Sequence, residues 1–588
     1  MSESPNNSHE QGMEKYFFRA SAADFKKIPG SPVAYWLSDA VIGSFEKGHL
    51  ISNACTTRKG MATGLNAVFV RSWHEVSLQS IGFSQSRAEA AKSCLRWFPY
   101  ANGGEYRKWY GNFDDVVNWE NDGHRLQTEQ HESGRIRAVN LNLDFIFKPG
   151  LSWTSITSGA FSIRVLPKGF LFSSASNAMF CNGESTLYAG LLNSKAHVVL
   201  GKAINPTLNA NPGDIGKIPL PNASVDVTKT IESITDLSRR DWDSYEVSWD
   251  FTGLALLHPD HRQPTLKASY QKLRAYWREM TLEMQRLEQE NNRIFIDAYG
   301  LQDELDEEVD LSEITLTCNP HYRYGGEKSE EELEVMLLAD TMRELVSYAV
   351  GCMFGRYSLD KPGLILANQA ETLADYLAQV LQPTFPADDD NVIPLLDGDW
   401  FPDDITLRFR QFLRVAFGDA HYEDNLAFIE QALNVKGKRN YSLRDYFLGE
   451  FYADHVKRYK KRPIYWLFSS PKGAFSALVY LHRYRSDTVS VVLSYLRDFR
   501  KKLASRLDYL QQVAISTSAS PSEKTKAIKE AEVVKKQLLE LDDYERDTLY
   551  PLATEQVDLD LDKGVKENYL RLGAAMKKIV GLDAKGED

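Results

Sequence analysis

Cationic, aromatic and amide side chains gather around a Gly-Gly turn between residues 99 and 123. The stretch PYANGGEYRKWYGN is followed closely by VVNWENDG. Arginine and lysine neutralise phosphates, and asparagine can pair with the edge of adenine through two hydrogen bonds. We interpret this stretch as a surface that grips duplex DNA and reads bases, in preference to a purely structural hairpin.

Residue types within this stretch predict separate roles. Arg107 and Lys108 suit phosphate or guanine, whereas Trp109 and Trp119 are expected to pack beneath the hairpin. Residues predicted to bind DNA are Tyr106, Arg107, Lys108, Tyr110, Asn112, Asn118 and Asn121, with Arg125, Arg135, Arg137, Lys148 and Arg164 as further phosphate contacts.

A second basic tract lies far downstream. Lys457, Arg458, Lys460, Lys461 and Arg462 surround one tyrosine. Such a tract can follow a DNA backbone, and it is equally typical of a solvated helix end. The sequence leaves both interpretations open.

Other candidate chemistries find little support. His124, His131 and Glu132 lie among glycines and glutamines without a third ligand, so a solvated loop is favoured and no metal site is predicted. The acids at 403–404 lack the lysine partner of a nuclease core. Five widely spaced cysteines without a CxxC pair are expected to be ordinary thiols.

Composition places these residues in a large globular protein. At 588 residues the chain should hold several domains, and neither a signal peptide nor a long apolar run is evident, so a cytoplasmic protein without membrane contact is expected. Net charge is −12, yet residues 1–220 hold 22 basic and 18 acidic residues, against 47 and 63 in residues 221–588. The mild positive excess falls on the N-terminal segment, residues 1–220, that contains the predicted DNA-binding stretch.

Pattern changes along the chain predict an α+β, multi-domain protein. A mixed, β-rich target-recognition domain is followed by a mostly α-helical C-terminal region with a long helical hairpin. The predicted boundaries are a flexible leader at 1–16, a connector at 17–60, the target-recognition domain at 61–222, a helical spacer at 223–309, a mainly helical domain at 310–490, and the helical hairpin and tail at 491–588.

Four local elements are predicted from the pattern. Alternating residues at 161–166 and a new run at 170–172 indicate a β-hairpin. A helix is expected from residue 185 to 192, and one long exposed helix over 265–296. Two amphipathic stretches within 491–545, broken at 516–521, predict an antiparallel helical hairpin.

Several long motifs resemble a known family. GGEYRKWYGN, IFIDAYGLQDEL at 294–305, ITLTCNPHYRYG at 314–325 and PIYWLFSSPKGAFSALVYLHRYR at 463–485 look like the C-terminal half of the BREX-type PglX family of adenine-specific DNA methyltransferases. The order of strands, an LYAGLLNS helix and an IGKIPLP exit is similar to target-recognition domains of restriction-modification specificity modules.

This resemblance implies that catalysis and DNA recognition belong to different parts of the enzyme. Family members carry upstream a Gly-rich loop for S-adenosylmethionine and an Asn-Pro-Pro-Tyr motif that holds a flipped adenine. This sequence has no Pro-Pro pair and no Gly-x-Gly turn between a strand and a helix. It therefore predicts no catalytic residue and no cofactor in this chain, with S-adenosylmethionine used by the intact enzyme. Implied partners are duplex DNA, a catalytic half or subunit, and other BREX defence proteins.

One segment imitates the catalytic motif. Asn319-Pro320-His321-Tyr322 differs from it at one residue, but we expect a strand end and a turn here. Two alternatives to DNA recognition remain. The chain could be an active adenine methyltransferase through an unrecognised or separately encoded catalytic site, or a structural component of a defence complex that does not read DNA.

Overall fold

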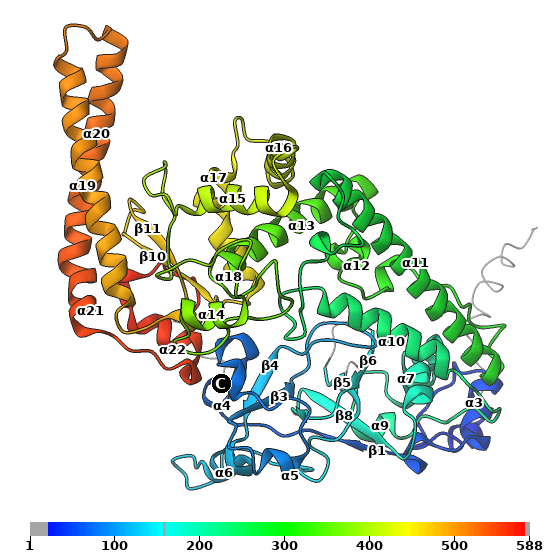
Figure 1. Ribbon diagram of the computed structural model, residues 1–588. Helices are drawn as coiled ribbons and strands as arrows, with labels where there is room; N and C mark the ends of the chain where they lie inside the picture. Colours follow the sequence, from blue (N-terminus) through cyan, green and yellow to red (C-terminus); the bar gives the residue numbers. More distant parts are fainter. Residues whose placement is uncertain (1–20, 157–159, 208, 583–588) are drawn as a thin grey trace, which may run out of the picture. The chain divides into compact units, whose positions relative to one another are not determined.

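The chain folds into two compact units in the computed structural model, which describes residues 21–156, 160–207 and 209–582. Figure 1 shows the ribbon coloured along the sequence. Among the described residues, unit 1 comprises 21–65, 82–242 and 278–323, and unit 2 comprises 66–81, 243–277 and 324–582. Each unit is thus assembled from stretches far apart in sequence. The leader predicted at 1–16 lies outside the described residues.

Two groups of strands form the centre of unit 1. An antiparallel sheet has the order β1-β8-β5-β6, with β1 at Cys55–Arg58, β5 at Gly150–Thr154, β6 at Ile163–Leu166 and β8 at Ser176–Cys181. In the second group β3 (Trp97–Ala101) pairs antiparallel with β4 (Asp115–Asn118) and parallel with β7 (Leu171–Phe172). All five residues of β3 are buried, as expected for a strand covered on both faces. Residues 102–114, the heart of the predicted DNA-binding stretch, connect β3 to β4.

The hairpin predicted at 161–172 is wrong. β6 pairs with β5, whereas β7 pairs with β3, so the two strands enter different sheets. Alternation of apolar residues indicates a strand, but the partner of that strand is chosen by which buried face it can complete.

Short helices surround these strands in unit 1. They are α2 (Ala22–Phe25), α3 (Asp39–Lys47), α5 (Arg87–Ala90), α6 (Glu120–Thr128), α7 (Thr186–Leu192), α8 (Lys195–Ile204), α9 (Pro212–Ile215), α10 (Thr228–Asp243) and α12 (Pro320–Tyr324). The helix predicted at 185–192 is confirmed by α7.

The long helix predicted at 265–296 is confirmed by α11 (Leu266–Tyr299), within which the chain passes from unit 2 to unit 1. Its expected exposure is wrong for one face. Residues spaced by three or four are buried along that face, namely Leu266, Tyr270, Leu273, Trp277, Met280, Met284 and Leu287. This spacing makes one apolar stripe on a helix whose other positions are charged.

Unit 2 is mainly helical around a small sheet. Its helices are α4 (Asn66–Phe69), α13 (Glu330–Met353), α14 (Leu373–Gln379), α15 (Ile405–Phe417), α16 (Tyr422–Leu433), α17 (Leu443–Tyr446), α18 (Tyr452–Arg458), α19 (Thr488–Ile515), α20 (Pro521–Tyr544), α21 (Tyr550–Glu555) and α22 (Gly564–Arg571). The strand β2 (Val70–Ser72) also belongs to it. An antiparallel sheet has the order β10-β11-β9, with β9 at Val392–Pro394, β10 at Tyr465–Ser469 and β11 at Ser476–Tyr480.

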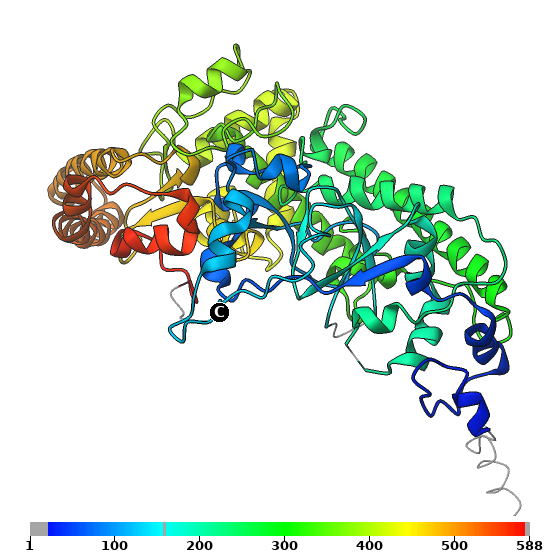
Figure 2. The ribbon, with the colours of Figure 1, turned by 90° about the horizontal axis from the view of Figure 1, so that it is seen from below.

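The predicted C-terminal helical hairpin is confirmed. α19 and α20 lie side by side, and Figure 2 shows them nearly end-on. Ser520 caps α20, because its hydroxyl accepts from Glu523 N while its own backbone N donates to the Glu523 carboxylate at 2.7 Å. Pro521 at the first helical position completes this start signal.

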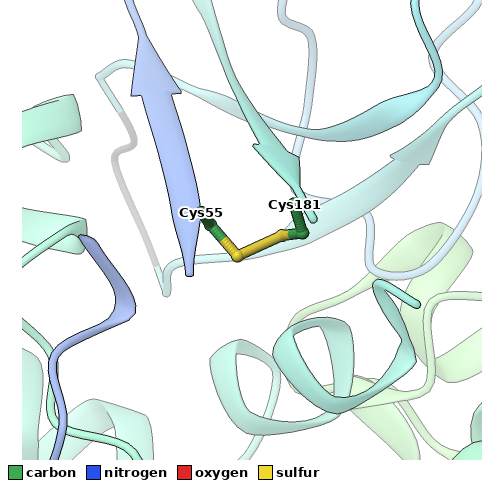
Figure 3. Close-up of a disulfide and its surroundings, with 2 residues drawn as sticks. All are labelled: Cys55 and Cys181. Atoms are coloured by element: carbon green, nitrogen blue, oxygen red, sulfur yellow. A yellow bond between two sulfur atoms is a disulfide. The ribbon is translucent and has the colours of Figure 1, made fainter. Parts of the chain in front are cut away.

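Cys55 and Cys181 form a disulfide (Figure 3), which corrects the expectation that all five cysteines are ordinary thiols. They stand directly opposite each other on β1 and β8, although 126 residues separate them in sequence. Cys94, Cys318 and Cys352 are not part of a disulfide among the described residues. The spacing of cysteines along the sequence could not predict this disulfide, because the register of β1 against β8 brings Cys55 and Cys181 together.

The predicted α+β, multi-domain class is confirmed. The predicted domain boundaries remain predictions. Among the described helices, none combines the length and the apolar character needed to cross a membrane.

Candidate nucleic-acid interface

Arg107 is the centre of a buried network in unit 1. Its Nη2 donates to Asp241 Oδ2 at 2.7 Å, its Nη1 to Thr317 Oγ1 at 2.9 Å, and its Nε to Tyr110 O at 2.8 Å. The guanidinium also stands over the Trp242 ring, 5.0 Å from its centroid. Side-chain exposure is 4% for Arg107 and 0% for Asp241. Burial without such partners would be unfavourable for either charge.

Lys108 has an equivalent partner on α11. Its ammonium group makes an ion pair with Glu288, which also accepts from Trp109 Nε1 at 2.7 Å. Burial acts to lower the pKa of Lys108, but the Glu288 carboxylate, together with Tyr106 and Glu313, raises the pKa above its ordinary value. The backbone N of Lys108 donates to Thr315 Oγ1 at 3.0 Å.

Arg164 is buried in the same part of unit 1, next to Arg107. Its Nη1 donates to Arg107 O at 3.0 Å, and its side chain is among the largest that are fully buried. Burial and the nearby Arg107 guanidinium lower the pKa of Arg164 to about 10. Tyr110 is also buried, with Arg239 stacked 4.9 Å from its ring centroid. Tyr106 is half-buried, and its carbonyl accepts from the Tyr322 hydroxyl at 2.5 Å.

These positions correct four predicted DNA contacts. Arg107, Lys108, Tyr110 and Arg164 are buried in unit 1, where the charged groups of the three cations have protein partners and the Tyr110 ring is covered by Arg239. A phosphate cannot approach a guanidinium that is almost completely buried and already paired with a carboxylate. In this structure Arg107 and Lys108 therefore stabilise the interior of unit 1 and do not face solvent.

The three asparagines differ from one another. Asn112 has a left-handed backbone, with φ of 61°, and its Nδ2 donates to Glu105 O at 2.8 Å. Asn118 is half-buried and accepts from Glu120 N at 3.3 Å. Asn121 is exposed. Asn112 and Asn118 thus hold turns, whereas the amide of Asn121 faces solvent.

Asn121 begins a left-handed turn at the start of α6. Asn121, Asp122 and Gly123 have φ values of 53°, 56° and 72°. Arg87 holds this turn, since its Nε and Nη2 donate to the two Asp122 oxygens at 2.9 and 2.8 Å. Arg87 Nη1 also donates to Leu143 O at 3.0 Å, which fixes the turn to the segment that precedes Lys148.

The remaining predicted cations lie on the surface of this same region. Arg125, Arg135 and Lys148 are exposed and Arg137 is half-buried. Arg137 belongs to a tight return of the chain after α6, where its backbone N donates to Glu129 O at 2.9 Å. Aliphatic side chains alternate with the cations, with exposures of 53% for Ile136, 51% for Val139 and 43% for Leu141. We call residues 121–148 the α6 surface.

The second basic tract separates into two groups in unit 2. Lys457, Lys460 and Lys461 are exposed. Arg458 is half-buried. Burial acts to lower its pKa, but Glu246 and Glu344, together with Tyr446 and Tyr459, raise the pKa above its ordinary value. Arg462 is also half-buried, with its Nε 3.8 Å from Glu75 Oε2. The tract thus lies at the end of α18 and has three exposed lysines.

Asn319 caps a helix. Its Nδ2 donates to Leu311 O at 2.7 Å and to Ile314 O at 2.8 Å, while its Oδ1 accepts from His321 N at 3.2 Å. The side chain is buried, and α12 follows directly, so the expected strand end is wrong. Every polar atom of this amide is engaged, which leaves none for an adenine amino group.

Metal binding finds no support in the described residues, where no group of three or more potential ligands occurs. His131 and Glu132 are exposed just after α6, as the predicted solvated loop requires, whereas His124 is exposed on the helix itself and not in a loop.

The sequence did not reveal the two carboxylates that keep Arg107 and Lys108 inside the protein. Asp241 and Glu288 lie 134 and 180 residues from their partners. No spacing rule reaches so far. One signal was present, because Arg107 and Lys108 directly precede Trp109, a residue expected to be buried. Cations beside a buried ring could have prompted a search for carboxylates on apolar helix faces, such as Glu288 on α11.

Comparison with known proteins reveals long-range similarity. No protein-family model matches the chain. Adenine-specific methyltransferase BrxX of Escherichia coli O9:H4 (strain HS) is 38% identical over 579 residues, which cover 95% of this chain and 46% of that protein. Adenine-specific methyltransferase PglX of Lacticaseibacillus casei (strain Zhang) is 36% identical over 581 residues, covering 96% of this chain and 46% of that protein.

An α+β protein with this similarity is a relative of adenine-specific methyltransferases. Its relation to the BREX-type PglX family extends over nearly the whole chain, which confirms the resemblance predicted from its motifs. The chain spans about half the length of the curated relatives it matches.

Proposed function

We propose that this chain recognises the DNA target for an adenine-specific methyltransferase of BREX-type phage defence, and binds duplex DNA on behalf of a separate catalytic domain. Similarity to BrxX and PglX over 95% or more of the chain carries this proposal. Its partners are duplex DNA, the catalytic methyltransferase portion and other defence proteins. S-adenosylmethionine serves the whole enzyme.

The α6 surface is the proposed contact with DNA. It combines exposed cations that can neutralise phosphates with an exposed asparagine amide on a rigid turn. Exposed aliphatic side chains between the cations suit contact with thymine methyl groups or with a widened groove. Four carboxylates, those of Asp122, Glu129, Glu132 and Asp144, share this region, so the proposal depends on individual contacts rather than on net charge.

Neutralising the exposed cations tests the proposed contact. Replacing Arg135, Arg137 and Lys148 by alanine should weaken duplex binding and reduce its logarithmic salt slope by up to about 3, because each phosphate contact contributes about 0.9. Fluorescence anisotropy with a labelled duplex at four salt concentrations measures both quantities.

The matched control replaces Lys526, Lys529 and Lys536, three exposed lysines of α20 in unit 2, by alanine. It changes the net charge equally and should leave the slope unchanged. If the α6 variant retains the parent's affinity and slope, the proposed contact is wrong. If the parent itself does not bind duplex at low salt, the chain is a structural component.

Base reading is assigned to Asn121. An amide that reads adenine contributes about 1 to 3 kcal/mol of discrimination at one base pair. Asn121→Ala should therefore relax the preference at one position and preserve binding to random duplex. Selection from a randomised duplex pool compares it with Asn112→Ala, whose amide holds a turn. Identical recovered motifs for parent and Asn121→Ala would exclude base reading by this residue.

Catalysis within this chain is the second candidate, because both relatives are named methyltransferases. Two places in the chain that resemble parts of such a site do not fit it. Gly103 and Gly104 follow β3 without a helix start behind them, and the Asn319 amide is fully engaged. We expect the chain alone neither to bind S-adenosylmethionine nor to methylate DNA. Stoichiometric binding in calorimetry would instead favour the enzyme.

A further inference from the structure

A pocket of about 890 Å³ is formed entirely by residues of unit 2. Its walls come from the β10–β11 turn, the end of α18, the α19–α20 hairpin and residues 577–580. This volume lies within the range of pockets that bind ligands, about 300 to 1,000 Å³. The α6 surface belongs to unit 1, so the proposed function leaves this pocket unused.

The inner wall of the pocket is apolar. Leu467 of β10, Phe499 of α19 and Ile579 are buried there. Nearer the solvent, Leu448 is 43% exposed, Val533 54% and Val580 81%. Three exposed large aliphatic side chains around one concavity indicate a surface that an apolar group covers in the functional state.

Cations surround this apolar wall. The exposed side chains of Lys457, Lys461, Lys472, Lys577 and Lys578 line the pocket. Within the described parts of the chain, none of these five ammonium groups has an ion pair. Of the two carboxylates at the pocket, Glu530 is paired with Arg506 at 2.7 Å, and Asp397 is the other. The pocket is thus strongly positive within a region, residues 221–588, where acids outnumber bases by 63 to 47.

Backbone structure holds these lysines in place. Lys577 N donates to Leu467 O at 2.8 Å, and Met576 pairs with Phe468, so residues 576–577 run along the edge of β10. Lys460 and Lys461 have φ of 48° and 63°, a left-handed backbone that residues with a side chain seldom adopt. With this backbone Lys461 lines the pocket.

We propose that this pocket binds an acidic peptide segment of a partner protein. One or two aliphatic or aromatic side chains of the segment enter the apolar wall, and flanking carboxylates pair with the lysines. Recognition of acidic motifs by cation clusters and of apolar anchors by grooves are both recurrent modes of peptide binding. A DNA backbone would satisfy the lysines but would leave the exposed aliphatic side chains without a partner.

Selection from a displayed random 12-residue peptide library on the immobilised full chain tests the proposal. Enriched peptides should carry several Asp or Glu residues around one or two Leu, Ile, Phe or Trp residues. The most enriched peptide is then labelled and its dissociation constant measured by anisotropy. Failure to enrich any peptide, or enrichment without acids, overturns the proposal.

Variants locate the binding site. Lys457→Ala combined with Lys461→Ala and Lys577→Ala should raise the dissociation constant at least tenfold, as should Val533→Glu, which places a repelling charge in the apolar wall. The α20 triple variant at Lys526, Lys529 and Lys536, outside the pocket, should bind as the parent does. All substituted side chains are exposed, and thermal unfolding verifies the fold.

Modified peptides separate a peptide pocket from a general polyanion surface. Replacing the acids by amides, or the apolar anchors by serine, should each weaken binding at least tenfold. Equal binding by the serine version, or competition by a 20-base-pair duplex at similar affinity, would overturn the proposal in favour of a polyanion surface. Neither result bears on the α6 surface, whose variants lie in unit 1.

Discussion

At the scale of residues, two neighbouring cations show that tertiary contacts decide whether a cationic side chain is available to bind a phosphate. Arg107 and Lys108 have the side chains of a phosphate-binding site, yet Asp241 and Glu288 neutralise them inside unit 1. Removing one member of a buried pair leaves an uncompensated charge, which is far less favourable than the pair. Their contribution is to hold the β3–β4 connection against α10 and α11.

Arg107→Ala should lower the free energy of unfolding by about 3 to 5 kcal/mol, since Asp241 remains buried without its partner. Urea unfolding followed by circular dichroism measures this change. Arg125→Ala, which removes an exposed guanidinium of the same unit, should change stability by about 0.5 kcal/mol or less. Similar small effects for both variants would contradict the anchoring role.

His482 should make unit 2 sensitive to acid. Burial, with a contribution from Arg356, lowers the pKa of His482 to about 3, and its Nε2 lies 3.2 Å from Val76 O. Below the ordinary histidine pKa of about 6.5, the unfolded chain binds a proton that the folded chain binds only near pH 3. Stability that is present near pH 7 is therefore lost as the pH falls through this window.

Comparison with His482→Gln isolates this titration, because the amide can still donate to Val76 O. Between pH 7 and pH 4.5 the parent should lose about 1 to 3 kcal/mol more unfolding free energy than the variant. Urea unfolding at five pH values provides the measurement. Parallel curves for the two proteins would show that His482 does not titrate as expected.

At the scale of elements, the start of α6 shows how local backbone geometry presents a side chain. Three successive left-handed residues carry Asn121 to the surface, while Arg87 and Trp119 fix Asp122. A Cβ on Gly123 would meet the Trp119 ring at 2.6 Å. Glycine is thus required both for the backbone and for the close approach of the ring.

Gly123→Ala and Gly134→Ala form a matched pair. Both glycines have φ above 70°, but a Cβ at Gly134 would meet nothing within 4 Å. We expect Gly134→Ala to cost about 1 to 2 kcal/mol, and Gly123→Ala a further 1 to 3 kcal/mol because of the clash with Trp119. Chemical denaturation of both variants gives the difference. Equal losses would mean that the ring moves aside without cost.

At the scale of the whole molecule, unit 1 depends on stretches that the sequence separates. Residues 82–242 supply Arg107 and Lys108, whereas Glu288 and Thr315 come from 278–323, beyond a stretch that belongs to unit 2. The predicted target-recognition domain at 61–222 would therefore leave two cations in its interior without carboxylate partners.

A fragment of residues 61–222 should consequently show no cooperative thermal unfolding in circular dichroism, in contrast to the full chain. The same fragment with Arg107→Met and Lys108→Met should be more ordered, since it no longer buries unpaired charges. A cooperative transition in the unmodified fragment would show instead that 61–222 is an independent domain.

The sequence by itself determined the elements with strong periodicity. The helix over 265–296, the helix over 185–192 and the C-terminal helical hairpin follow from repeats of three to four residues and from local start signals. The relation to adenine-specific methyltransferases also came from the motifs, because long stretches of specific residues identify ancestry without any knowledge of contacts.

Only the tertiary structure decided which of the charged residues reach solvent and which strands become partners. The sheet register joined Cys55 to Cys181, and the pairing of β6 with β5 removed the predicted hairpin. Arg107 is buried in an ion pair with Asp241, whereas Lys461, which belongs to the other basic tract, is exposed and lines the unit 2 pocket. The physical reason is that burial and pairing depend on residues brought together from far along the chain, whereas periodicity and caps are properties of neighbours.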